Sequence, residues 1–135
     1  MTGAVAGFSD IQANPPKRKR ITVICPVFNE ESVIPIFYDR FLKAVEPLRA
    51  QYDLELIFTN NRSTDGTLKV IQRIRESDPS VQVLTLSRNF GYQASLQAGL
   101  SVAGGDAVLF IDVDCEDPPR MIPEFVEKWE HGYDV

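Results

Sequence analysis

The chain has 135 residues, a length suited to one domain. Hydrophobic residues make up 44% of it and charged residues 24%, so it has enough apolar material for a core and lacks the composition of a disordered chain. Its longest clear apolar run, residues 107–111, is far shorter than the roughly 20 residues that a membrane-spanning helix needs. The first 20 residues lack the order of a secretory signal, in which an apolar stretch follows the basic residues.

The net charge of −5 is unevenly distributed. Residues 1–20 hold four basic groups and one acidic group, which leaves an excess of acid in residues 21–135. Nucleic acid is bound through clustered Lys and Arg, so this balance argues against a nucleic-acid partner and leaves room for a metal ion. Cys25 and Cys115 lie far apart and fit neither a disulfide scaffold nor a paired zinc motif. We therefore expect two free thiols in a reducing compartment.

The first third of the chain predicts a tail, a strand and a helix. Residues 1–20 are rich in small and polar residues and end in a basic tetrad, so we expect a flexible tail. Residues 21–25 form a β-branched run and predict a buried strand. Apolar residues at helical spacing predict a helix over residues 33–45, with residues 30–32 supplying acids and a cap for its first turn. Pro47 is expected to kink or end that helix.

The same unit then repeats. Residues 54–58 predict a second strand, and a helix through residues 68–74 follows it. Ser63 or Thr64 is expected to cap this helix. Residues 81–86 predict a third strand.

The last third adds one more repeat of the pattern. A third helix is predicted over residues 92–103, and the five apolar residues 107–111 predict a fourth strand that is buried on both faces. A final amphipathic helix is predicted over residues 119–129, and another strand could start at residues 132–135. Strand and helix thus alternate four times, which predicts an α/β fold with a mostly parallel sheet, helices on both faces, and a sheet that is part of a larger protein.

Polar residues follow every predicted strand. In open α/β sheets, ligands bind outside the carboxyl ends of the strands, so these four loops are expected to meet at one rim. The loops are residues 26–30, 60–65, 87–89 and 112–117.

The loop after the fourth strand is the most informative. Asp112, Asp114 and Glu116 alternate with other residues, so in an extended backbone their carboxylates point to one side. Three carboxylates at such short distances repel one another unless they bind a cation. Mg²⁺ or Mn²⁺ bound by carboxylates usually shares its coordination with substrate phosphates. The alternative is a solvated acidic turn before Pro118.

Several other candidate residues have two possible roles each. The loop at residues 63–67 precedes a helix, and its N–H groups suit phosphate, although Asp65 would oppose an anion. Arg88 is either a surface cation or a phosphate contact. Phe28 and Tyr92 either stack on a base or pack at the rim.

Five blocks in order carry a resemblance to a known family: residues 25–31, 63–67, 87–93, 103–107 and 112–119. Together they resemble family 2 glycosyltransferases of GT-A fold, and most closely the branch of dolichol-phosphate mannose synthases and bacterial polyprenyl-phosphate glycosyltransferases. The resemblance runs from Ile21 to the last residue and covers the family's N-terminal, nucleotide-binding part. It implies a Rossmann-like GT-A fold that is truncated, with residues 21–135 as the nucleotide-sugar-binding part.

The resemblance also implies roles for individual residues. Asp112 and Asp114 would be catalytic and, with Glu116, would hold the metal and the diphosphate of a sugar nucleotide. The residues implied for nucleotide binding are Pro26, Val27, Asn29, Glu30, Asn60, Asn61, Ser63, Asp65, Arg88 and Asn89.

This chain departs from the family's pattern at two points. Members usually carry Asp-Asp-Gly where this chain reads Asn60-Asn61-Arg62, so it lacks a charged acceptor for the nucleotide. The usual Leu-Gln is here Cys115-Glu116, and a carboxylate there should hold a cation at least as well as an amide.

The implied reaction is a metal-assisted, inverting displacement that moves a sugar from a nucleotide diphosphate to a polyprenyl phosphate. An ionised phosphate nucleophile needs no strong protein base. The family's acceptor-binding half and membrane helices would follow this segment, so residues 1–135 alone are expected to be inactive. The complete protein is expected at the cytoplasmic face of the membrane, and formation of a homo-oligomer stays open.

Two other functions remain as alternatives. One is a catalytically degenerate nucleotide-binding or scaffold module, which the Asn60-Asn61 departure allows. The other is a receiver-like signalling domain, which needs an acid pair after the first strand and an Asp after the third. This chain has Asn29-Glu30 and residues 87–89 at those places, so the fit is poor.

Overall fold

The computed structural model describes residues 18–114 and 118–132. The strands are β1 (Arg20–Val27), β2 (Asp53–Asn60), β3 (Val81–Thr85) and β4 (Ala107–Phe110). The helices are α2 (Ile34–Val45), α3 (Thr67–Ser77), α4 (Tyr92–Val102) and α5 (Ile122–Glu130), with short 3₁₀ turns at Glu46–Leu48 and Pro119–Met121. Residues 1–17 of the expected tail, Cys115, Glu116 and Asp117, and residues 133–135 of the expected strand start lie outside the described residues, whereas Arg20, the last residue of the expected tail, begins β1.

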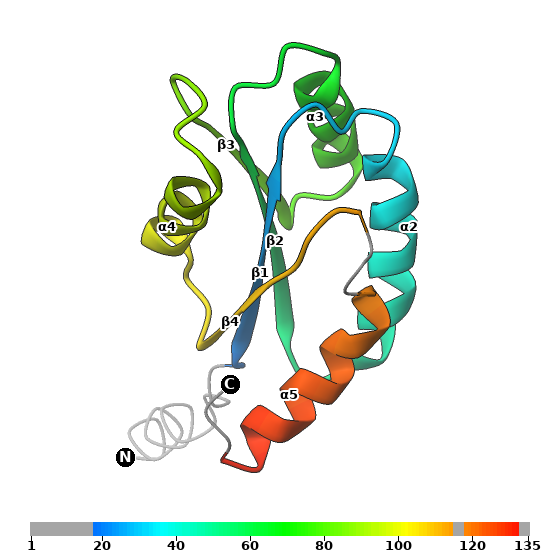
Figure 1. Cartoon of the computed structure of the whole chain (residues 1–135). Coiled ribbons are helices and arrows are strands. Elements are labelled where there is room, and N and C mark those ends of the chain that lie inside the picture. The colour runs from blue at the N-terminus through cyan, green and yellow to red at the C-terminus, as the bar shows by residue number, and fades with distance from the viewer. Residues whose placement is uncertain (1–17, 115–117, 133–135) are drawn as a thin grey trace, which may run out of the picture.

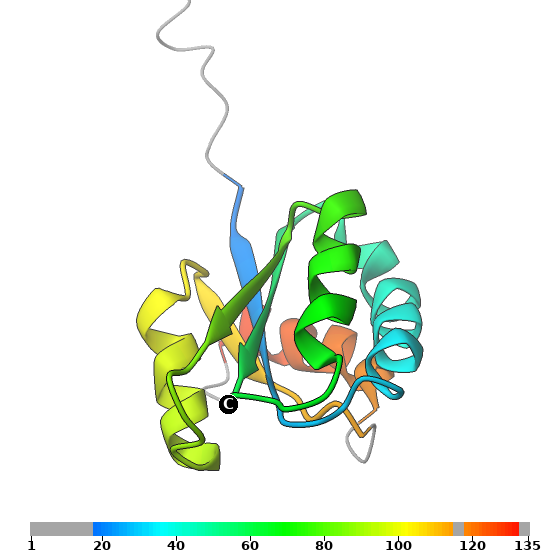
Figure 2. The same ribbon diagram turned by 90° about the horizontal axis from the view of Figure 1, so that it is seen from above.

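The four strands form one parallel sheet in the order β3-β2-β1-β4. Helices α2, α3 and α5 cover one face, and α4 covers the other (Figures 1 and 2). This confirms the predicted parallel sheet with helices on both faces. No helix in the described part of the chain is both long and apolar enough to cross a membrane.

The main core lies between the sheet and helices α2, α3 and α5. Alternate residues of β1 and β2 point into it, as the period of two in a strand requires. The Phe37 ring lies 6.1 Å from the ring of Phe41 and 6.1 Å from that of Phe58, measured between centroids. Further core residues are Ile21, Val23, Cys25, Val27, Leu56, Ile34, Ile71, Ile122 and Val126.

The other face of the sheet is covered closely by α4. A Cβ atom at Gly99 would lie 2.6 Å from Cγ2 of Ile24 and 3.0 Å from Cγ2 of Thr59. One turn earlier, the Ser95 hydroxyl donates a hydrogen bond to Oγ1 of Thr59 over 2.8 Å. Small residues on α4 therefore let the helix lie directly on β1 and β2.

Three local expectations were wrong. β4 is not buried on both faces, since Phe110 is 48% exposed; β4 is the edge strand of the described sheet, and α4 packs over β1 and β2 instead. The helix after β1 begins at Ile34 with no side-chain cap. Neither Ser63 nor Thr64 caps α3, which begins after Gly66 with no side-chain cap, because those two hydroxyls bond to asparagine side chains.

The strand order creates a crevice beside β1. The chain moves outward from β1 to β2 and β3, and α4 then carries it across the opposite face to β4, on the other side of β1. The order in which strands are added to the sheet therefore reverses between β1 and β4. Open α/β sheets bind their ligands at such a reversal of strand order, called a switch point. A ligand site is therefore expected at the carboxyl ends of β1 and β4.

Candidate functional site

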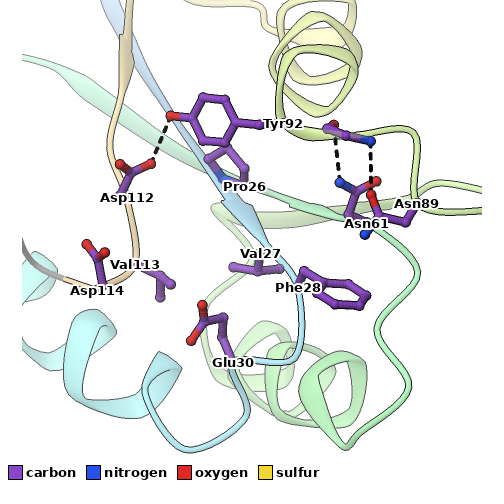
Figure 3. A pocket seen from close by; sticks show the side chains of 11 residues that line it. Pro26, Val27, Phe28, Glu30, Asn61, Asn89, Tyr92, Asp112, Val113 and Asp114 are labelled. Carbon is purple, nitrogen blue, oxygen red and sulfur yellow. Dashed lines mark hydrogen bonds between the residues drawn. The ribbon is translucent and has the colours of Figure 1, made fainter.

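A pocket of about 530 Å³ opens at this switch point, within the usual size of a small-molecule site. Asp112 and Asp114 lie at one side of it, and Asn61 and Asn89 lie at the other (Figure 3). The lining residues are Pro26, Val27, Phe28, Glu30, Asn61, Asn89, Gly91, Tyr92, Asp112, Val113 and Asp114.

One side of the site is built by the loops after β1 and β2, residues 28–31 and 60–67, which we call the interlocked wall. Asn29 adopts a left-handed backbone conformation with φ of 53°. Its Oδ1 accepts hydrogen bonds from the N–H groups of Thr64 (2.8 Å) and Asp65 (3.3 Å). Its own N–H donates to Oγ of Ser63 over 3.0 Å. One asparagine thus joins two loops that are far apart in the sequence.

Thr67 makes a second connection within the interlocked wall. Its hydroxyl is completely buried, accepts a hydrogen bond from the Glu30 N–H (2.9 Å) and donates one to Oδ1 of Asp65. The Thr67 hydroxyl is the main cause that lowers the pKa of Asp65, with further hydrogen bonds from backbone N–H groups. Because the N–H groups of Thr64 and Asp65 already have an acceptor in Asn29, the expected phosphate-binding role of this loop stays a prediction.

The rest of the pocket is lined by residues from the segments 89–92 and 112–114, which we call the clasped wall. Oδ1 of Asn89 accepts a hydrogen bond from the Gly91 N–H over 2.9 Å. The Tyr92 hydroxyl donates to Oδ1 of Asp112 over 2.9 Å, as Figure 3 shows. This bond joins the start of α4 to the segment that follows β4.

Carboxylates make the pocket acidic. Burial raises the pKa of Glu30, and repulsion from Asp114 and Asp65 raises it further. The residues present therefore fit a divalent cation, because carboxylate oxygens are its preferred ligands and one or two of them suffice when substrate phosphates complete the coordination. Within residues 18–114 and 118–132, no group of three or more His, Cys, Asp or Glu side chains is arranged to hold a metal. Glu116, the third expected ligand, is outside these ranges.

The structure brings together only some of the predicted site residues. Those that line the pocket are Pro26, Val27, Glu30, Asn61, Asn89, Asp112 and Asp114. Those that do not line it are Asn29, Asn60, Ser63, Asp65 and Arg88. Arg88 instead stacks on a neighbour, with its guanidinium carbon 4.4 Å from the centroid of the Phe90 ring.

Four lining residues were absent from the predicted site set: Phe28, Gly91, Tyr92 and Val113. For Phe28 and Tyr92, the sequence indicated only a base-stacking or rim role. For Tyr92, the available signal was its place at the first turn of a helix that follows a polar loop. For Val113, the signal was its place between the two aspartates.

The sequence profile described as "Glycosyl transferase family 2" matches residues 22–135. The chain belongs to this family. A prophage bactoprenol glucosyl transferase homolog of Escherichia coli is 45% identical over 116 residues, which are 86% of this chain and 37% of that protein. An undecaprenyl-phosphate 4-deoxy-4-formamido-L-arabinose transferase of Photorhabdus laumondii is 33% identical over 118 residues, 87% of this chain and 36% of that protein.

Solved structures confirm the expected fold of this family 2 chain. The mannosyltransferase PcManGT of Pyrobaculum calidifontis, solved in complex with GDP-Man and Mn²⁺, matches with a TM-score of 0.63 and 26% identity. The match covers 84% of this chain and 36% of PcManGT. The GT-A fold that the sequence resemblance implied is thus confirmed, and the chain spans little more than a third of the length of each of these proteins.

Proposed function

We propose that this chain is the nucleotide-sugar-binding part of a transferase that moves a sugar from a nucleotide diphosphate to a polyprenyl phosphate. The observation that carries the proposal is the position of Asp112 and Asp114 in the pocket at the switch point. The names of the relatives support a lipid-phosphate acceptor, and the GDP-Man and Mn²⁺ in the PcManGT complex support a nucleotide-sugar donor and a divalent ion.

Asp112 and Asp114 are the residues that would hold Mg²⁺ or Mn²⁺, together with Glu116. A bound divalent ion supplies Lewis-acid stabilisation for the charge that develops on the departing diphosphate. The pocket wall formed by Pro26, Val27 and Glu30 would position the nucleotide. Phe28 offers an aromatic ring, 43% exposed, on the same wall.

The reaction we propose is a single displacement with inversion. An oxygen of the acceptor phosphate attacks the anomeric carbon while the bond from that carbon to the diphosphate oxygen breaks, and the nucleoside diphosphate leaves. The attacking oxygen is already ionised, so no proton must be removed from it.

The remaining features of the whole protein are also proposals. Residues 21–135 would be the donor-binding part, and residues 1–20 a basic tail that leads into β1 at Arg20. The acceptor site and membrane contact would lie in the part that the relatives have beyond this match. The complete enzyme would work at the cytoplasmic face of the membrane.

Calorimetric titration tests the proposal. UDP, GDP and their sugar conjugates are titrated into the chain with Mn²⁺ and again with a chelator. We expect one of the two nucleotides to bind, with binding at least tenfold weaker in the chelator and in Asp114→Asn, because the shared charge contacts are lost. Asp39→Asn is the matched control, since Asp39 is an exposed residue of α2 that pairs with Lys43 and does not line the pocket. Nucleotide binding that is unchanged both by the chelator and by Asp114→Asn would contradict the proposal. No detectable binding of any nucleotide would favour the scaffold alternative.

A further inference from the structure

Asn61 ties the end of β2 to a distant turn. It directly follows β2, and its side chain is nearly buried, with 7% of the residue exposed. Its Oδ1 accepts a hydrogen bond from the Phe90 N–H (3.2 Å), and its Nδ2 donates one to the Gly91 carbonyl (3.2 Å). Figure 3 shows the second of these bonds. Both polar atoms of this amide are thus committed to one turn of the chain.

The turn at residues 89–91 determines where α4 begins. Gly91 has φ of 94° and ψ of 171°, a backbone region open essentially to glycine. Nothing lies within 4 Å of the Cβ position there, so the need for glycine comes from the backbone and not from space. The Gly91 carbonyl also accepts a hydrogen bond from the Ser95 N–H (3.2 Å) in the first turn of α4. Asn61 therefore holds the first turn of α4 against the end of β2.

The next residue extends this connection across the pocket. Tyr92 opens α4, and its hydroxyl donates to Asp112 over 2.9 Å. The series of contacts thus runs from Asn61 through the turn to Tyr92, and from Tyr92 to one of the two aspartates proposed to hold the metal. All members except Phe90 line the pocket.

We propose that Asn61 is a positioning residue for the donor site: it fixes the turn that carries Tyr92, and Tyr92 in turn orients the Asp112 carboxylate. The inference rests on the function proposed above. It also gives a physical reason for an amide at position 61. A carboxylate only accepts hydrogen bonds at neutral pH, so it would repel the Gly91 carbonyl and add charge to a pocket that already holds Glu30 and Asp112.

A pair of neighbouring substitutions separates this role from a general effect of charge. Asn61→Asp removes the donor to Gly91. Asn60→Asp makes the same change one residue earlier, where Oδ1 only accepts from Ser63, and where the Thr85 hydroxyl (3.3 Å) can rotate to donate to a carboxylate. Asn60 does not line the pocket.

Two readouts are measured for both variants and wild type at pH 7.5 and pH 5.5. The first is the dissociation constant of UDP and of GDP in the presence of Mn²⁺. The second is the set of backbone amide NMR signals of residues 90–92 without nucleotide. We expect Asn61→Asp to bind about tenfold more weakly than wild type at pH 7.5, the equivalent of one lost hydrogen bond. The ratio of the dissociation constant of Asn61→Asp to that of wild type should fall towards one at pH 5.5, because a protonated carboxyl regains a hydrogen-bond donor. The amide signals of residues 90–92 should change with pH only in this variant.

The outcomes distinguish this inference from the function on which it rests. Equal binding by Asn61→Asp and Asn60→Asp, or a weakening that is the same at both pH values, would overturn the positioning role while the proposed function stands. If wild type binds neither nucleotide, the proposed function fails and the donor-site role of Asn61 fails with it, while the amide signals still report whether Asn61 holds the turn.

Tyr92→Phe tests the second step with little risk to folding, since Tyr92 is 50% exposed. It should weaken nucleotide binding several-fold with Mn²⁺ and leave the amide signals of the turn in place. Unchanged binding would overturn the step from Tyr92 to Asp112.

Discussion

The two walls of the pocket are held in different ways. The interlocked wall (residues 28–31 and 60–67) contains repeated side-chain to backbone bonds around Asn29 and the buried hydroxyl of Thr67. In the clasped wall (residues 89–92 and 112–114), the amide of Asn61 bonds to the turn, Asn89 accepts from the Gly91 N–H, and the exposed Tyr92 donates to Asp112. The first wall is therefore tied together around a buried hydroxyl, whereas the bond from Tyr92 to Asp112 in the second wall lies at the protein surface. We therefore expect the first wall to contribute more to stability and the second to adjust more readily to a ligand.

The largest effect on stability is expected from Thr67→Val. The change keeps the shape of the side chain but removes the acceptor for the Glu30 N–H and the donor to Asp65 inside the interlocked wall. We expect the free energy of unfolding to fall by about 2 kcal/mol, measured by urea denaturation. Thr64→Val is the control, because Thr64 is exposed, and should cost less than about 0.5 kcal/mol. Equal losses in the two variants would remove the basis of the contrast.

Asn29 allows its backbone and side-chain contributions to be separated. Asn29→Ala loses the acceptor for two N–H groups and places an alanine at φ of 53°, so it should cost about 1.5 kcal/mol. Asn29→Gly loses only the acceptor, since glycine tolerates that φ, and should be the more stable of the two in the same denaturation experiment. The reverse order would show that the left-handed conformation is not what selects Asn29.

Acid should weaken the interlocked wall. The pKa of Asp65 is lowered from its ordinary 3.8, chiefly by the hydroxyl of Thr67. Ionised Asp65 therefore contributes stability above its ordinary pKa, and this contribution is lost as the pH falls through the lowered pKa. The pKa of Glu30 is raised by burial, so its contribution has the opposite sign.

The measurement is the urea midpoint between pH 5 and pH 2.5. Asp65→Asn should show a smaller decrease in midpoint over this range than wild type does. Parallel curves for the two proteins would contradict the role given to Asp65.

The smallest effect on stability is expected in the clasped wall. Tyr92→Phe removes a hydrogen bond between two solvent-accessible groups and should change the free energy of unfolding by less than about 0.5 kcal/mol. Thermal unfolding followed by circular dichroism measures this. A loss well above 1 kcal/mol would mean that the clasped wall is also part of the stable framework.

Much of the fold could be predicted from local patterns. The β-branched run at residues 21–25 and the helical spacing in residues 33–45 are properties of neighbouring residues, and all four strands and four helices were found. The burial of β4 could not be predicted, because an apolar run reports composition and not the strand's place in the sheet. Strand order is decided by pairing between distant segments, and β4 lies at the edge of the described sheet.

The site was predictable where position along a strand decides it. Asp112 and Asp114 follow β4 and line the pocket, as strand ends in a parallel sheet predict. Asn29 and Asn60 were harder to assign, because an amide side chain can bind a ligand or form hydrogen bonds within the protein. Asn29 joins two loops, and Asn60 bonds to Ser63 and Thr85, contacts that depend on segments brought together only by folding.

In the proposed donor site, Asp112 and Asp114 hold a divalent ion whose coordination a nucleotide diphosphate shares. Crystals of this chain soaked with MnCl₂ and UDP or GDP, measured at the manganese absorption edge, test it most directly. We expect an anomalous peak in the pocket between the two aspartates and the diphosphate, with the peak absent in Asp114→Asn. A nucleotide bound without manganese there, or a peak away from both carboxylates, would contradict it.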